Sequence, residues 1–316
     1  MSPDSCVYNV PMDINSRTLR TSGLDPLLAM SRNRSHIQEA RRFTLGPMPV
    51  PIFLDTFLPT DGVIERDCSS LIDAFEAVPR CADKPAMIYE PLCSALAKLC
   101  PGFAFDKSIE RCIRPSRLGH VKPHISCFAR ENLPHIQQAD PALRLEFGYA
   151  ELFKQCTSKP SVDFWVDPPP GANVQGLATH DFAQRFDDDE QRTEAMRTFG
   201  SHIAFATEVF ARQHRVFLYT ISVAGSSARF FRWDRSRCVV TEAFDIHEQP
   251  EAFADFLWRF SKLSDAKRPS HLFLVVVLFS CYPGSRVPMM DRRNAFTSSD
   301  RVLPYDTQGG CSGGSD

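Results

Sequence analysis

The sequence has no closely spaced pair of cysteines. Eleven cysteines are dispersed along the 316 residues, their number is odd, and no Cys-x-x-Cys occurs. Neither a zinc site nor a disulfide framework is therefore indicated. Some of them, such as Cys93 and Cys127, lie inside apolar segments, where a reduced thiol packs as a small hydrophobic side chain. We expect free thiols in an intracellular protein, either cytoplasmic or nuclear.

Long apolar runs and a strong charge of one sign are also missing. The most apolar stretch, residues 272–279, is far shorter than the roughly 20 residues that a membrane-spanning helix needs. The N-terminus lacks the basic and apolar regions of a secretory signal. The net charge is -2, so the composition predicts no general affinity for nucleic acid. We expect no contact with a membrane.

Three regions differ in character. Residues 1–45 are polar and predict a mobile arm with one short helix near residues 25–30. Residues 46–268 carry the periodic patterns of a folded domain. This domain begins with a proline-rich stretch, residues 46–51, expected to be extended. An apolar anchor, residues 53–59, follows and is expected to dock on the rest of the domain. Residues 269–316 end in a glycine- and serine-rich sequence and predict a disordered tail.

The periodic patterns predict an α+β, mixed α/β fold. Its central sheet includes an antiparallel meander of three strands and is flanked by helices. Gly225 and the Asp234–Arg237 segment supply the turns of the meander. The expected helices are residues 68–75, 87–99, 187–213 and 250–261, and the expected strands are residues 125–128, 149–155, 216–223, 228–233 and 238–243. Residues 105–122 and 167–171 are expected to be loops.

The acidic run Asp187–Glu190 has two interpretations. Four carboxylates in sequence are a candidate metal site. They also supply negative charge where a helix N-terminus favours it, and an apolar stripe at helical spacing follows from Met196 to Phe210. We favour the capped start of a helix.

Several blocks, in this order, resemble the fungal-type protein kinase family. The most specific is the arginine-flanked segment Arg229–Arg235, and the resemblance extends over about residues 40–268. The blocks are GPMPVPIFLDTFLP (46–59), YEPL (89–92), FGYAELF (147–153), FGSHIAFATEVFARQHR (199–215), VAGSSARFFRWDRSRCVVTE (223–242) and FLWRF (256–260).

In that family a kinase core follows these blocks, which places its expected start near Arg268. A kinase needs a Gly-rich loop, a strand lysine, a catalytic-loop aspartate and an Asp-Phe-Gly metal ligand. The set does not occur here, and the terminal glycines lack a neighbouring strand and helix. The resemblance thus implies a truncated, kinase-like pseudoenzyme, or a splicing boundary near residue 268.

The resemblance also implies a PD-(D/E)xK nuclease-like fold as an open alternative for residues 46–268. In such a fold a helix Glu, a strand Asp and a Glu-x-Lys on the next strand gather a divalent metal and a lysine. Glu90 matches the helix Glu. His124 stands where the family tends to have Asp, and Gln155 and Thr157 replace the Glu-x-Lys.

These substitutions predict no catalytic residue, no cofactor and no metal ligand set, and they disfavour an enzyme. Glu90, His124, Glu151, Gln155 and Thr157 remain as degenerate candidates. Glu151, together with Asp163, would supply the carboxylates of a rescued metal site.

The arginine-flanked segment has a functional and a structural interpretation. Arg229, Arg232, Trp233, Asp234 and Arg235 combine cations with an aromatic side chain, which suits a phosphate or a peptide. A turn aspartate paired with arginine across a hairpin explains the same residues, and we favour that role. His202, on the long helix expected at residues 187–213, is interpreted as a packed or solvated histidine.

The sequence thus favours a non-catalytic accessory or interaction domain whose partner is the kinase core of a related chain or another protein. The alternative is a degenerate PD-(D/E)xK-like domain that keeps metal or nucleic-acid binding. A third interpretation is that this chain would be described as a kinase only because its relatives are kinases. In that case we expect it not to bind ATP.

Overall fold

The computed structural model describes residues 37–38, 40–60, 73–107, 123–138, 146–172, 176, 179–213 and 215–263. Several predictions lie wholly or largely outside these ranges. They are the arm up to residue 36 with its short helix, most of the helix expected at residues 68–75, most of the loop expected at residues 105–122, and the tail expected beyond residue 268. Within the described residues no helix is both long and apolar enough to cross a membrane.

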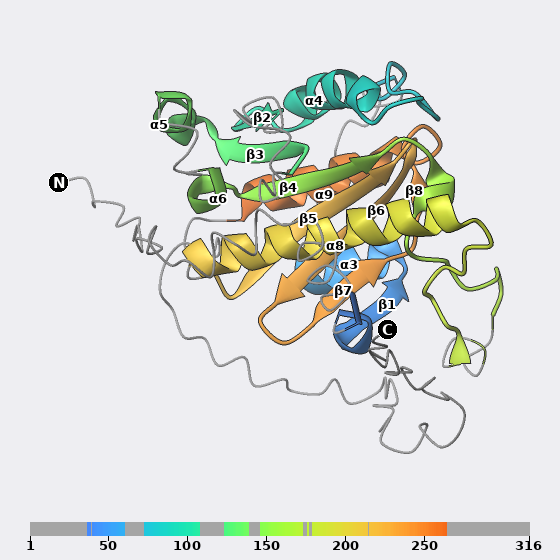
Figure 1. Cartoon of the computed structure of the whole chain (residues 1–316). Coiled ribbons are helices and arrows are strands. Elements are labelled where there is room, and N and C mark those ends of the chain that lie inside the picture. Colours follow the sequence, from blue (N-terminus) through green and yellow to red (C-terminus); the bar gives the residue numbers. More distant parts are fainter. Residues whose placement is uncertain are drawn as a thin grey trace, which may run out of the picture. The chain divides into compact units, whose positions relative to one another are not determined.

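A mixed sheet forms the centre of the domain (Figure 1). Its strand order is β1-β7-β6-β5-β4-β3-β2, and the short strand β8 pairs with β6. β4 runs parallel to β5 and β1 runs parallel to β7, while the other pairs are antiparallel. The predicted α+β class is confirmed. The strands are β1 (Thr44–Met48), β2 (Phe103–Asp106), β3 (Ile125–Ala129), β4 (Leu152–Thr157), β5 (Phe217–Ala224), β6 (Ser227–Asp234), β7 (Cys238–Thr241) and β8 (Phe244–Asp245).

The predicted meander is β5, β6 and β7, and its turns follow the expected chemistry. Gly225 has φ 61° and the space for a β carbon there is taken by the Arg80 carbonyl oxygen. Only glycine therefore fits the turn between β5 and β6. At the next turn, the Asp234 carboxylate accepts hydrogen bonds from the backbone N–H groups of Ser236 and Arg237. The turn residues thus set the register of the meander.

Helices cover both faces of this sheet. One apolar core is formed with α3, α4 and α9, and includes Phe53, Leu92 and Phe256. A second core, on the α8 side, includes Phe153 and Phe199. Alternate residues of β4 enter different cores, as the two-residue repeat of a strand requires. The helices are α3 (Val50–Phe57), α4 (Ala86–Leu99), η3 (Arg130–Asn132), α5 (Leu133–Gln138), α6 (Glu146–Tyr149), η5 (Pro160–Val162), α8 (Asp189–Arg212) and α9 (Pro250–Lys262).

The capped helix predicted behind the acidic run is confirmed as α8. Asp188 is its N-cap, and its side chain accepts a hydrogen bond from the Gln191 N–H at 2.8 Å. Asp189 and Glu190 occupy the first turn, where the helix dipole favours negative charge. Two carboxylates of the run thus stabilise the helix end and a third caps it.

Several boundaries differ from the prediction. The segment expected to be extended at residues 46–51 is extended only up to Met48, in β1, and α3 starts at Val50, because a proline fits the first turn of a helix. Thr44 and Leu45, assigned to the arm, belong to β1. Tyr149, expected in a strand, lies in α6 instead, and β2 takes the first residues of the loop expected at 105–122. The predicted docking of residues 53–59 is confirmed, since Phe53, Leu54 and Leu58 are buried.

One buried arginine connects the sheet to the segment before α8. Arg229 on β6 is 3% exposed and pairs with Asp163 at 2.6 Å and with Asp167. Its guanidinium also donates to the carbonyl oxygens of Trp165 and Thr241. Asp167 in turn accepts the backbone N–H of Ala243. The residues of the 163–167 segment are therefore tied to β6 and to the end of β7 by a single cation.

Removing this cation should destabilise the domain. Arg229→Ala leaves two carboxylates partly buried without their partner, and breaking a buried pair in this way costs about 3–5 kcal/mol. The free energy of unfolding from urea titration measures the loss. Arg235→Ala is the matched control, because Arg235 is exposed on the β6–β7 turn; its effect should stay within about 0.5 kcal/mol. Equal effects of the two substitutions would contradict the role of Arg229.

Candidate functional site

The nuclease-like positions come together at the start of β3 and along β4. His124 directly precedes β3, and the backbone N–H of Cys156 on β4 donates to His124 Nδ1 at 3.0 Å. Cys156 lies between Gln155 and Thr157 in β4. The histidine ring stacks on Tyr89 of α4, with ring centroids 5.0 Å apart. His124 thus lies beside the part of β4 that carries Gln155 and Thr157 and against Tyr89 of α4, whereas the side chain of Glu90 is exposed.

His124 is a neutral side chain in this setting. Burial lowers its pKa to about 4, and the nearby positive charge of Arg197 acts in the same direction. The ring accepts a hydrogen bond through Nδ1, so Nε2 carries the proton of the neutral imidazole. An aspartate at this position would bring a negative charge, which His124 does not supply.

Gln155 and Thr157 are buried and uncharged. Gln155 Oε1 and Thr157 Oγ1 have no hydrogen-bond partner within the described part of the chain. Thr157 lines a cavity of about 20 Å³ together with Trp165 and His202, a volume close to that of a single water molecule. The two positions offer neutral oxygen and nitrogen atoms in place of the carboxylate and the ammonium of a Glu-x-Lys.

The remaining carboxylates are engaged elsewhere. Glu90 is 68% exposed on α4 and pairs with Lys107 at 2.7 Å. Glu151 pairs with the buried Arg215 at 2.8 Å, and Asp163 pairs with Arg229. Among the described residues, no group of three or more His, Cys, Asp or Glu side chains is arranged to hold a metal ion. The structure therefore places Glu151 and Asp163 in ion pairs that support the fold.

The arginine-flanked segment is built into the hairpin. Trp233 is 6% exposed, and its Nε1–H donates to Thr220 Oγ1 at 2.7 Å, so its ring is no exposed stacking surface. Arg232 lies over the rings of Phe57 and Phe217, at 4.8 and 5.0 Å, and pairs with Asp234 at 3.4 Å. Arg235 lies over the ring of Phe210 at 5.7 Å. These contacts hold the side chains of Arg232, Trp233 and Arg235 against neighbouring elements of the domain.

His202 is packed in the α8-side core, as the sequence suggested. Its Nε2 is 2.6 Å from the Thr220 hydroxyl, which also accepts the hydrogen bond from Trp233. The Thr220 hydroxyl thus joins His202 and Trp233 in one buried hydrogen-bonded group. Burial lowers the pKa of His202 to about 3, so this histidine is neutral at ordinary pH.

Sequence reasoning missed a buried lysine, Lys154. Its Nζ has no hydrogen-bond partner within the described residues and lies 4.1 Å from the centroid of the Phe105 ring. Burial lowers its pKa, while nearby thiols, first that of Cys127, act in the opposite direction. The alternation of side chains along β4 could have predicted this burial, because Lys154 shares one face of the strand with the apolar Leu152 and Cys156.

Comparison with known proteins supports the resemblance over part of the chain. Residues 178–267 match the family model described as fungal protein kinase. This range holds α8, the meander and α9, and therefore the last three of the six sequence blocks. The blocks between residues 46 and 153, which the sequence assigned to the same family, lie outside the match. No curated protein and no solved structure gives a significant match.

Replacing Lys154 by methionine should stabilise the domain. Methionine has a similar length and no polar hydrogen, so the substitution removes the penalty of an amine without a partner, about 1–3 kcal/mol. Urea unfolding measures the gain. Lys154→Ala is the control, since it removes the same amine but leaves a cavity and should be less stable than Lys154→Met. A methionine variant less stable than the parent protein would contradict this account.

Stability should fall as the pH is lowered from about 6.5. His124 and His202 have folded-state pKa values of about 4 and about 3, below the value of roughly 6.5 expected in the unfolded chain. Between these values the unfolded state binds protons that the folded state excludes. Each histidine then costs about 1.4 kcal/mol per pH unit.

Urea unfolding between about pH 7 and pH 5 tests this dependence. His202→Gln should reduce the slope of stability against pH. His135→Gln is the control, because His135 is exposed in α5 and its loss should leave the slope unchanged. The same slope in His202→Gln and in the parent protein would contradict the assignment.

Proposed function

We propose that this chain carries a non-catalytic accessory domain of the fungal protein kinase type, which acts by binding a kinase catalytic core or another protein. The match at residues 178–267 supports the kinase-like relationship. One observation carries the non-catalytic part. Of the positions that the nuclease-like resemblance implies, His124 lies beside the part of β4 that carries Gln155 and Thr157, and these three are uncharged, while Glu90 is exposed and pairs with Lys107.

The chemistry of these donors argues against phosphodiester hydrolysis. Magnesium prefers hard, charged oxygen ligands, and a metal-dependent nuclease needs several of them in one place to activate water. Here the imidazole is neutral, the amide and the hydroxyl are weak ligands, and Glu90 is paired at the surface with Lys107. The domain is therefore proposed to keep a nuclease-like framework without the charges that cleavage requires.

A second candidate function is retained because cations lie near these positions. The exposed Arg197 acts electrostatically on both Tyr89 and His124, and Lys107 pairs with the exposed Glu90. A degenerate PD-(D/E)xK-like domain that still binds a nucleic-acid phosphate or a metal would use these groups. We rank it second because two cations do not replace a metal ligand set.

The two proposals predict different results with the whole chain. The accessory domain should form a complex with the catalytic domain of a fungal-type protein kinase, detected by size-exclusion chromatography and cross-linking. A chain that stays monomeric and shows no affinity for that domain would contradict the proposal. A nuclease assay with Mg²⁺ or Mn²⁺ should show no cleavage above background.

Two glutamate variants make the nuclease assay decisive. Should the parent chain cleave nucleic acid, activity that is lost in Glu90→Ala and kept in Glu251→Ala would establish the second candidate and overturn the first. Glu251 is the matched control, because it is an exposed carboxylate in the first turn of α9. Cleavage kept in both variants would point to a contaminating nuclease, and the proposal would then rest on the binding experiment.

A further inference from the structure

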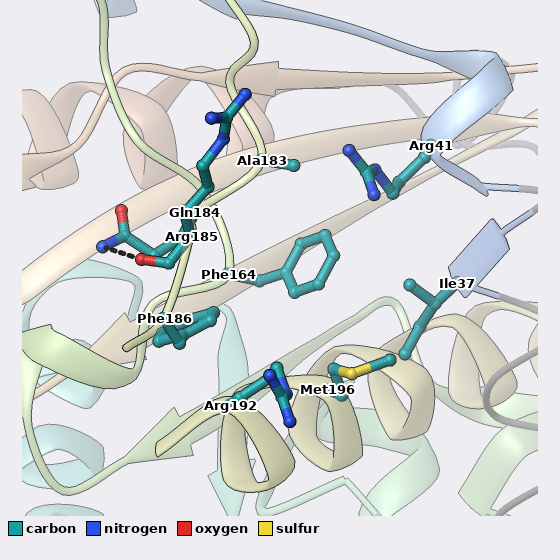
Figure 2. A pocket seen from close by; sticks show the side chains of 9 residues that line it. All are labelled: Ile37, Arg41, Phe164, Ala183, Gln184, Arg185, Phe186, Arg192 and Met196. Carbon is teal, nitrogen blue, oxygen red and sulfur yellow. Dashed lines mark hydrogen bonds between the residues drawn. The ribbon is translucent and has the colours of Figure 1, made fainter. Parts of the chain in front are cut away.

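A second cavity lies on the α8 side of the sheet, apart from the nuclease-like positions. It measures about 300 Å³, at the lower end of the range for small-ligand sites. Its wall brings together helical residues before β1, the segment around Phe164, the loop before α8 and the first turns of α8 itself (Figure 2). The lining residues are Ile37, Arg41, Phe164, Ala183, Gln184, Arg185, Phe186, Arg192 and Met196.

The floor of this cavity is apolar and is packed against its surroundings. Phe164 stacks on Phe199 of α8 with ring centroids 4.5 Å apart and meets Trp165 edge-on at 4.9 Å. The Arg229 network holds the backbone of this segment through the carbonyl of Trp165. Ile37 and Met196 complete the floor. A ring or a short aliphatic group of a ligand would find a preformed apolar surface here.

The rim is cationic. Three arginines line the cavity, and none of its nine lining residues carries a carboxylate. The Arg41 and Arg192 side chains are about half exposed, at 50% and 52%. Figure 2 shows them on opposite sides of the Phe164 ring, while Arg185 extends away from it. Two guanidinium groups therefore flank the apolar floor.

Acidic neighbours leave these guanidinium groups available to a ligand. Asp181 lies 3.6 Å from Arg41 and 3.8 Å from Arg185, which is longer than a hydrogen bond. Asp189 pairs with Arg192 but is 85% exposed, and a surface pair of this kind contributes little. A guanidinium has five donors, so each arginine can bind an anion without losing a strong partner.

From this arrangement we infer that the cavity binds a small aromatic anion, a ring that carries a phosphomonoester or a carboxylate. The ring would lie on Phe164 and Met196, and the anionic group would accept hydrogen bonds from Arg41 and Arg192. Planar guanidinium groups match both phosphate and carboxylate geometry. This site does not depend on the proposed accessory role.

Isothermal titration of the full chain with phenyl phosphate tests the inference. Inorganic phosphate and benzyl alcohol supply the anion and the ring separately, and each should bind at least about tenfold more weakly than phenyl phosphate, because both parts of the cavity contribute. Benzoate in place of phenyl phosphate distinguishes a carboxylate from a phosphate ligand. Equal affinity for inorganic phosphate and phenyl phosphate would overturn the aromatic part of the inference.

Three variants locate the binding. Arg41→Ala and Arg192→Ala should each weaken phenyl phosphate binding roughly tenfold through the loss of charged hydrogen bonds. Ala183→Leu should weaken binding by narrowing the cavity without changing its charge. Arg235→Ala, an exposed arginine on the β6–β7 turn, is the matched control and should bind like the parent chain.

Folding is checked separately, from the melting temperature and circular dichroism of each variant. Absence of binding in the folded parent chain overturns the inference. Binding that Arg41→Ala, Arg192→Ala and Ala183→Leu all leave unchanged overturns it as well.

Discussion

The buried guanidinium of Arg229 is the interaction on which the α8 side of the domain depends. A cation at this depth is tolerated only when its charge and its N–H groups are satisfied. Asp163, Asp167 and two backbone carbonyls satisfy them. The consequence is geometric, since the segment from Asp163 to Asp167 is held against β6. Phe164 and Trp165 are thereby placed on α8, and Phe164 lines both cavities of that face.

The same network explains why candidate metal ligands turned out to be structural. In a sequence, Glu151 and Asp163 are merely carboxylates near a strand. In the structure each faces a buried arginine that lies 64 or 66 residues further along the chain. Such pairing follows from strand order and register, which local patterns do not contain. A carboxylate that neutralises a buried arginine is costly to remove from that role, so it is a poor candidate for binding a metal.

Elements with strong local signals were predictable. The apolar stripe and the acidic cap predicted α8, and the turn chemistry of Gly225 and Asp234 predicted the meander. Prolines misled the prediction at β1 and α3, because proline suits both an extended segment and a first helical turn. The positions of Glu90, His124, Gln155 and Thr157 were singled out from the resemblance alone, and the structure brings His124 next to β4 but leaves Glu90 exposed. No local sequence pattern predicts the cavity beside Phe164, since its walls come from four segments that are separate in the sequence.

The two candidate regions, around His124 and beside Phe164, differ in the charge state of their side chains. A catalytic acid or base works best when its pKa lies near the working pH. Around His124 burial moves the pKa values of the titrating groups away from neutrality, lowering that of His124 and raising that of Tyr89. These side chains keep one protonation state across the ordinary pH range. The arginines beside Phe164 need no such tuning, because a guanidinium stays charged at any working pH. A fixed charge next to an apolar floor suits recognition, whereas buried groups with strongly shifted pKa values do not change their protonation state near neutral pH.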